Sequence, residues 1–211
     1  MNTQEKILNA AKTSFALKGF KGTSVRDICL AADVASSAIH YHFKNKEGLL
    51  QHLFESFGEK HLEAAWKILD NPKTFDEVKI RLEMFLDSVL SSFLEDPALF
   101  RLVQKEIEDL NPNIEETFKN TFLKIVERMI DFLEKSKKKG IIDKKINSQI
   151  AVKYLLNHIC GQVRSDDLSQ RFYNLSLKDP TYKKYWIEQS LYIFLKGIKN
   201  EVKNEPRRTL N

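Results

Sequence analysis

The sequence predicts an all-α fold, and three observations support this class. Only 7 Gly and 5 Pro occur among 211 residues, which is few for a chain rich in turns or strands. Apolar residues recur at helical spacing along most of the chain. Pairs that favour the start of a helix, such as Asp96-Pro97 and Asp179-Pro180, separate these stretches. We therefore expect long helices joined by a few connections.

The first fifty residues predict three short helices and the start of a longer one. Helical spacing over residues 5–18 is followed by Gly19, a residue typical of a helix end. Ser24 and Asp27 have the spacing of a capping box, which predicts a second helix that ends at Asp33-Val34. Ser36 or Ser37 is expected to cap a third helix, and Asn45 a fourth.

The rest of the sequence predicts further helices and a division into two domains. The fourth helix should extend to about residue 70, and later helices should lie near 75–95, 97–111, 113–140, 147–170 and 180–200. We expect Asn113 with Glu116 to cap the helix that stops at Gly140, and residues 205–208 to form a frayed tail. Residues 1–47 are predicted to form one domain and residues 48–211 a second.

Two short helices joined by a tight turn, behind a longer helix, form a helix-turn-helix unit. Its inward positions are apolar (Val25, Ile28, Ala32, Val34, Ile39 and Phe43), whereas Ser36, Ser37, His40 and Tyr41 are free to face outward.

The charge of the chain is concentrated near its start. Residues 1–48 hold seven basic and four acidic side chains, so a net charge of +3 out of the chain's +5 lies there. This distribution is typical of a surface that binds phosphates.

The stretch Ile7–Phe54 resembles the DNA-binding domain of the TetR family. The resemblance rests on Ala10-Ala11, Gly19-Phe20, Thr23–Ile28, Ala31–Val34 and Ile39–Leu50. It departs in the turn, where Asp33 stands in place of a common Gly, and at His40, where an aromatic such as Tyr is more frequent. The resemblance implies a transcription regulator that binds double-stranded operator DNA as a homodimer and senses a small-molecule effector.

The candidate DNA-binding residues combine this resemblance with the chemistry of base and phosphate recognition. The resemblance implies that Ser36, Ser37, Ala38 and His40 face bases, that Tyr41, His42 and Lys46 contact phosphates, and that Ser24 and Arg26 lie near the DNA backbone. A recognition helix needs side chains that hydrogen-bond base edges, and helix N-termini bind anions through free N–H groups. Local roles within the protein remain open for His42 and Arg26.

The second domain is expected to hold the effector and to form the dimer interface. Candidate lining residues of an apolar pocket are Phe85, Val89, Phe93, Phe122, Met129 and His158. Family members pair their last two helices, so the resemblance implies an interface that includes Tyr154, Leu155, Ile159, Val163, Trp186, Gln189, Ile193 and Phe194. Part of this stripe must also face its own subunit. A dimer suits a palindromic operator because two-fold symmetry doubles the contacts.

Other classes of protein fit the sequence less well. It contains no Gly-rich phosphate loop, no metal-ligand spacing and no nucleophile–base pattern, so we expect neither an enzyme nor a bound metal or cofactor. It has no apolar run long enough for a membrane span and no signal peptide, which predicts a soluble, cytoplasmic protein.

A repressor released by its effector is the first hypothesis. An activator, a co-repressor-dependent regulator and a helical hydrophobe carrier without DNA binding remain alternatives.

Overall fold

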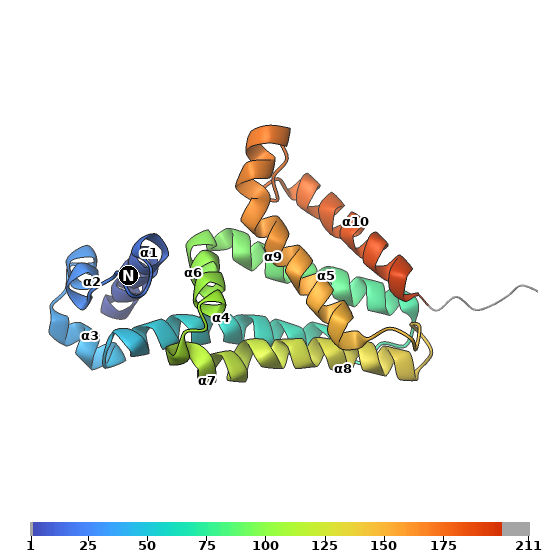
Figure 1. The fold of residues 1–211 in the computed structure, drawn as a ribbon, viewed down its shortest axis with the longest axis horizontal. Helices are drawn as coiled ribbons and strands as arrows, with labels where there is room; N and C mark the ends of the chain where they lie inside the picture. The colour runs from blue at the N-terminus through green and yellow to red at the C-terminus, as the bar shows by residue number, and fades with distance from the viewer. Residues whose placement is uncertain (1, 200–211) are drawn as a thin grey trace, which may run out of the picture.

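The computed structural model describes residues 2–199, and throughout this range the fold is helical, as predicted (Figure 1). The only extended pairing among these residues is an isolated bridge between Ile142 and Lys199. The expected tail at residues 205–208 lies outside the described residues. The helices are α1 (Thr3–Lys18), α2 (Val25–Ala32), α3 (Ser36–Phe43), α4 (Lys46–Ile68), α5 (Phe75–Glu95), α6 (Pro97–Glu108), α7 (Glu115–Phe118), α8 (Lys124–Lys138), α9 (Ser148–Tyr173) and α10 (Pro180–Ile198).

Helices α1–α3 form a small N-terminal head whose helix ends follow from local chemistry. The predicted capping box is present at the start of α2, where the side chains of Ser24 and Asp27 each accept a hydrogen bond from the other residue's backbone N–H. Asp33, at the end of α2, has φ 53° in the left-handed region, a conformation that Asp tolerates better than most residues. The expected cap of α3 was wrong: Ala35 is the N-cap, and Ser36 and Ser37 are the first two helical residues.

The long helix α4 connects the head to the larger C-terminal part, which we call the body (Figure 1). It begins after Asn45, whose side chain accepts a hydrogen bond from the backbone N–H of Gly48, as predicted. It packs against α1 and α3 in the head and against α5 and α8 in the body. The predicted domain boundary between residues 47 and 48 falls in the first turn of this helix, so the two parts share one continuous rod. The boundary itself stays a prediction.

The segment between α6 and α8 differs from the expected helix capped by Asn113. A 3₁₀ turn, Pro112–Ile114, is capped by Asn111 instead, and α7 leads through a π-helical turn, Lys119–Leu123, into α8. Thr121 in this π-helical turn packs directly against Gly58 of α4, where an added Cβ would lie 2.5 Å from the Thr121 side chain. π-Helical turns are rare and occur often at functional sites.

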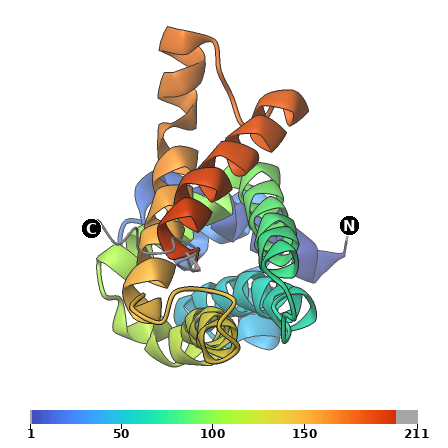
Figure 2. The ribbon, with the colours of Figure 1, turned by 90° about the vertical axis from the view of Figure 1, so that its right-hand side faces the viewer.

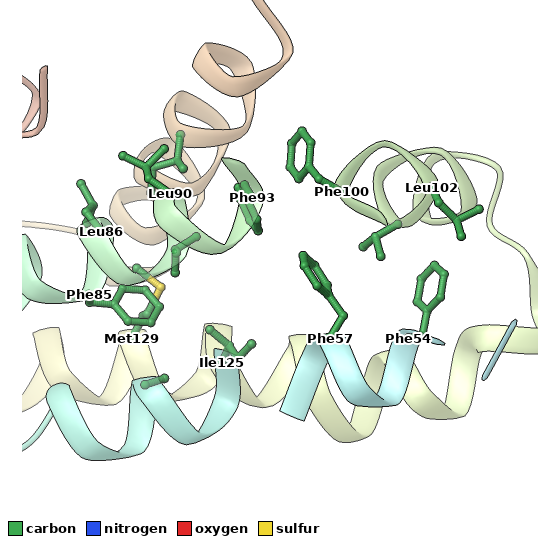
Figure 3. Packing of buried hydrophobic residues seen from close by; sticks show 14 of the residues in the cluster. Phe54, Phe57, Phe85, Leu86, Leu90, Phe93, Phe100, Leu102, Ile125 and Met129 are labelled. Carbon is green, nitrogen blue, oxygen red and sulfur yellow. The ribbon is translucent and has the colours of Figure 1, made fainter. Parts of the chain in front are cut away.

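Helices α9 and α10 form a V-shaped hairpin that rises from α5 and α8 (Figures 1 and 2). The C-terminal end of α9 extends beyond the rest of the body (Figure 2). The apolar core continues from the head through the body, and buried side chains of α4, α5, α6 and α8 meet in its middle (Figure 3). None of the described helices carries an apolar stretch long enough to span a lipid bilayer.

Candidate nucleic-acid interface and interior cluster

Helix α3 presents a polar face to solvent and an apolar face to the head. Ile39 and Phe43 are buried against the other helices of the head. Ser36, Ser37 and His40 are exposed, and none of their side chains has a hydrogen bond within the described part of the chain. A short helix with free donors and acceptors on its outer face has the chemistry needed to bond base edges in the major groove.

Two aromatic side chains and a small one complete this face of α3. Tyr41 is 85% exposed, and its ring meets the ring of His42 edge to face at a centroid distance of 4.9 Å. His42 also contacts the ring of Phe43, 6.0 Å away, which orients it at the C-terminal end of α3. Ala38 is half-buried beside them. The face thus offers polar groups along its length and a phenol hydroxyl at its end.

Of the three residues predicted near the phosphates outside α3, only Arg26 is free. It is exposed in the first turn of α2 and has no ion pair among residues 2–199. The hydroxyl of Ser24, in contrast, donates to Asp27 Oδ2 at 2.7 Å. That bond occupies its only donor, so the expected contact between this hydroxyl and a phosphate is not available while the capping box holds.

Lys46 also has a different role from the expected phosphate contact. Its ammonium donates to the backbone carbonyls of Phe20 and Thr23, at 3.0 and 2.9 Å, and lies 4.3 Å from the centre of the Phe20 ring. These contacts fasten the α1–α2 connection to the start of α4. The sequence pattern placed Lys46 beside the recognition helix. It gave no indication of the two backbone carbonyls that the Lys46 ammonium binds across the head.

Lys44 is a candidate phosphate contact that the sequence reasoning missed. It follows α3 directly, is exposed, and has no ion pair within residues 2–199. Its φ of 68° turns the chain sharply at the end of the recognition helix. Its charge contributes to the basic balance of residues 1–48, which was the only signal for it in the sequence.

The predicted pocket residues lie in the body, with one exception. Phe85, Phe93 and Met129 are buried there (Figure 3). Val89 is also buried, and Phe122 is half-buried. His158 does not join them, because it is exposed on α9, where its ring stacks against Trp186 at 4.8 Å and bonds Ser190. The expectation that His158 lines the interior was therefore wrong: it packs between α9 and α10.

The structure also reveals an interior cluster of rings around His61. We define this ring cluster as Phe54, Phe57, His61, Phe93, Phe100, Phe118 and Phe122, which are linked by centroid distances of 4.5 to 6.3 Å. The residues come from α4, α5, α6, α7 and the π-helical turn. Phe57, Phe93 and Phe100 point into the space between α4, α5 and α6 (Figure 3). His61 is 5% exposed and is the only polar side chain of the cluster.

The residues predicted at the dimer interface divide between two faces of α9 and α10. Leu155, Ile159 and Phe194 are buried in the chain's own core, and Trp186 is covered by His158, so these four cannot form a face toward a second copy. Val163 is half-buried. Tyr154, Gln189 and Ile193 are exposed, and Tyr154 and Ile193 remain 55% and 63% accessible. Helical patterning alone did not separate the two faces.

Comparisons with known proteins agree with this fold and with the head. The sequence profile of the bacterial regulatory proteins, tetR family, matches residues 7–53. YttP of Bacillus subtilis (strain 168), named a probable HTH-type transcriptional regulator, is 37% identical over 110 residues, which are 51% of each chain. The chain therefore spans about half the length of this relative.

Two solved structures share the fold over almost the whole chain. The ketosteroid transcriptional regulator KstR2 of Mycobacterium tuberculosis is 21% identical with a TM-score of 0.73, covering 95% of this chain and 96% of the other. The fatty acid degradation regulator FadR from Bacillus halodurans is 18% identical with a TM-score of 0.71, covering 93% and 96%. Residues 7–53 thus match the model of the tetR family of bacterial regulatory proteins, and almost the whole chain shares its fold with these two regulators. All three proteins are named as regulators.

Proposed function

We propose that this chain is a sequence-specific DNA-binding repressor that binds a palindromic operator as a homodimer and is released by a small, largely apolar effector. The observation that carries the proposal is the outer face of α3. Ser36, Ser37 and His40 are exposed there without hydrogen-bond partners in the described part of the chain, above a buried apolar face. Base edges in the major groove would supply the missing partners.

The exposed side of α9 and α10 supports the homodimer. Several large apolar side chains of these two helices are exposed, namely Ile150, Tyr154, Tyr185, Tyr192 and Ile193. Large exposed apolar patches are uncommon on monomers and mark interaction sites. A second copy that packs its own α9 and α10 on this face would bury the patch in a two-fold arrangement, which places two heads on the two halves of a palindrome.

The body supports an effector that is largely apolar. Its interior contains many aromatic side chains, and small-molecule sites are mainly apolar with a few polar groups. The two structural neighbours are named as regulators for ketosteroid and for fatty acid degradation. Because α4 runs from the ring cluster into the head, an effector that favours one position of α4 would change the spacing of the two recognition helices.

The test is a selection of random DNA duplexes with purified protein, repeated at low and moderate salt. We expect an enriched palindrome bound by a dimer, with affinity that falls steeply as salt rises because phosphates are neutralised. Weak binding without sequence preference would overturn the regulator proposal. Once the operator is known, an effector that raises operator affinity would overturn release and support co-repression.

A further inference from the structure

The ring of His61 is held in one tautomer by its own helix. Its Nδ1 lies 2.9 Å from the carbonyl oxygen of Phe57, one turn earlier in α4. A carbonyl oxygen can only accept, so Nδ1 carries the proton and donates. Burial lowers the pKa of His61 to about 4, so the ring is neutral near pH 7. In this form Nε2 has a free lone pair and acts only as an acceptor.

No group within residues 2–199 donates a hydrogen bond to this lone pair. Nε2 is fully buried and has no hydrogen-bond partner among the described residues. The His61 ring stacks at 5.4 Å on Phe93, and its other close neighbour is Phe57 at 4.5 Å. Neither phenyl ring can supply a conventional donor. A buried acceptor without a partner costs free energy, and such atoms in native proteins require an explanation.

A second feature of the same place indicates a binding function. The π-helical turn Lys119–Leu123 brings Phe122 to within 6.2 Å of Phe57, next to His61. Such turns are rare and occur frequently at functional sites. The lone acceptor and the π-helical turn therefore meet in one aromatic environment, between the helix that leads to the head and the helices of the body.

We propose that Nε2 of His61 is the polar anchor of the effector site, and that the effector is an uncharged, largely apolar molecule whose hydroxyl group donates to it beside the rings of Phe57 and Phe93. This inference rests on the proposed function and adds the chemical class of the effector. The phenyl rings around Nε2 favour an uncharged molecule, and a hydroxyl supplies the donor that the site lacks.

The experiment compares two probes that differ in one group, 4-ethylphenol and 4-ethyltoluene, by calorimetry with the full-length protein. In the wild type the phenol hydroxyl donates to His61 and the methyl group of ethyltoluene does not. We expect His61→Phe to weaken binding of ethylphenol about tenfold and to leave binding of ethyltoluene unchanged. His61→Leu is a second, smaller replacement, and circular dichroism checks that both variants fold. His158→Phe is the matched control and should change neither affinity.

Two results would overturn the inference. One is that ethylphenol affinity is the same in wild type and in both His61 variants. This is the result expected if a water molecule, and not the probe, donates to Nε2. The other is that neither probe binds up to its solubility. The Nε2 nitrogen resonance of His61 gives an independent readout, because it must shift when ethylphenol binds and stay when ethyltoluene binds.

Operator binding is measured separately on the same samples, by fluorescence anisotropy. Failure to bind any operator, together with the expected probe affinities, would reject the regulator proposal and keep the His61 site. Operator binding, together with an ethylphenol affinity that does not depend on His61, would reject the His61 site and keep the regulator proposal. The two proposals can therefore fail independently.

Discussion

The ammonium group of Lys12 in α1 lies 2.6 Å from Oδ2 of Asp96, the residue that caps α6. The other oxygen of Asp96 accepts a hydrogen bond from the backbone N–H of Leu99 at 3.1 Å. One carboxylate thus joins the head to the body and also starts a helix of the body. Both side chains are mostly buried, at 22% and 29% exposure, so this ion pair is screened less than a surface pair.

We expect Lys12→Met and Asp96→Asn each to lower the free energy of unfolding, with a coupling between them of about 1 kcal/mol. The reason is that each change removes the same ion pair, while Asn keeps the ability to cap α6. Urea unfolding of the two single variants and the double variant measures the coupling. Additive effects would contradict a direct interaction between the head and the body at this point.

The buried His61 predicts a dependence of stability on pH. Its pKa is about 4 in the folded protein and near 6.5 in the unfolded chain, so the unfolded state binds more protons between these values. The free energy of unfolding should therefore fall as the pH drops from 6.5 to 4, by about 3 kcal/mol from this group. His61→Phe should remove this contribution. Chemical unfolding across this pH range checks it, and parallel profiles for the two proteins would contradict it.

Substitutions on α3 should separate base recognition from phosphate contact. His40→Ala is expected to weaken operator binding about 10- to 100-fold and to relax the preference at one base position, because we propose that His40 faces bases. Tyr41→Phe should weaken binding to all sequences by a similar factor. Both residues are exposed, so thermal stability should not change. Leu17→Ala, an exposed position on α1, is the control. Equal loss of specificity in both variants would argue against these separate roles.

The exposed face of α9 and α10 predicts the effect of a single charge on assembly. Ile193→Lys should convert the proposed dimer to a monomer in sedimentation velocity runs, because it would bury an unpaired ammonium in the proposed interface. Ile80→Lys introduces the same charge at a similarly exposed isoleucine on α5 and should leave the dimer intact. Dissociation by Ile80→Lys, or a dimer that survives Ile193→Lys, would place the interface elsewhere.

Short-range signals made much of this fold predictable. The capping box of Ser24 with Asp27, the Asn45 cap and the Asp96-Pro97 start each depend on atoms within three residues, and the structure has all three. The same rule failed at Ser36 and Ser37, because two serines in a row offered caps and the chain used the residue before them. Local pattern therefore located the helices better than it located their first residues.

The candidate sites depended on contacts that no local pattern records. In the sequence His61 stands between Lys60 and Leu62, within a helix rich in charged residues, and it does not look buried. It is buried because Phe93, more than thirty residues later, stacks on it. Lys46 looked free for the same reason, since its carbonyl partners lie more than twenty residues earlier. Outward polar residues on α3 were easier to predict, because the spacing of Ile39 and Phe43 fixes which face is buried.

The contact between Gly58 and Thr121 predicts opposite effects for two glycine substitutions. Gly58→Ala should lower the free energy of unfolding by about 1 to 3 kcal/mol, because the new Cβ would overlap the buried side chain of Thr121. Gly197→Ala in α10 has open space around its new Cβ and should be stabilising by about 0.5 to 1 kcal/mol. Thermal unfolding of both variants checks this contrast. Two effects of the same sign would contradict it.

Gly58 also gives α4 the geometry of a lever. With no side chain at this residue, the helix rests against the π-helical turn at a fixed point between its two ends. Its N-terminal end is fastened to the head through Lys46, and its His61 turn lies just beyond the fixed point, inside the ring cluster. If α4 turned about this contact, a displacement of the short arm at His61 would swing the longer arm in the opposite direction. The amplitude at the head would then exceed the displacement that caused it.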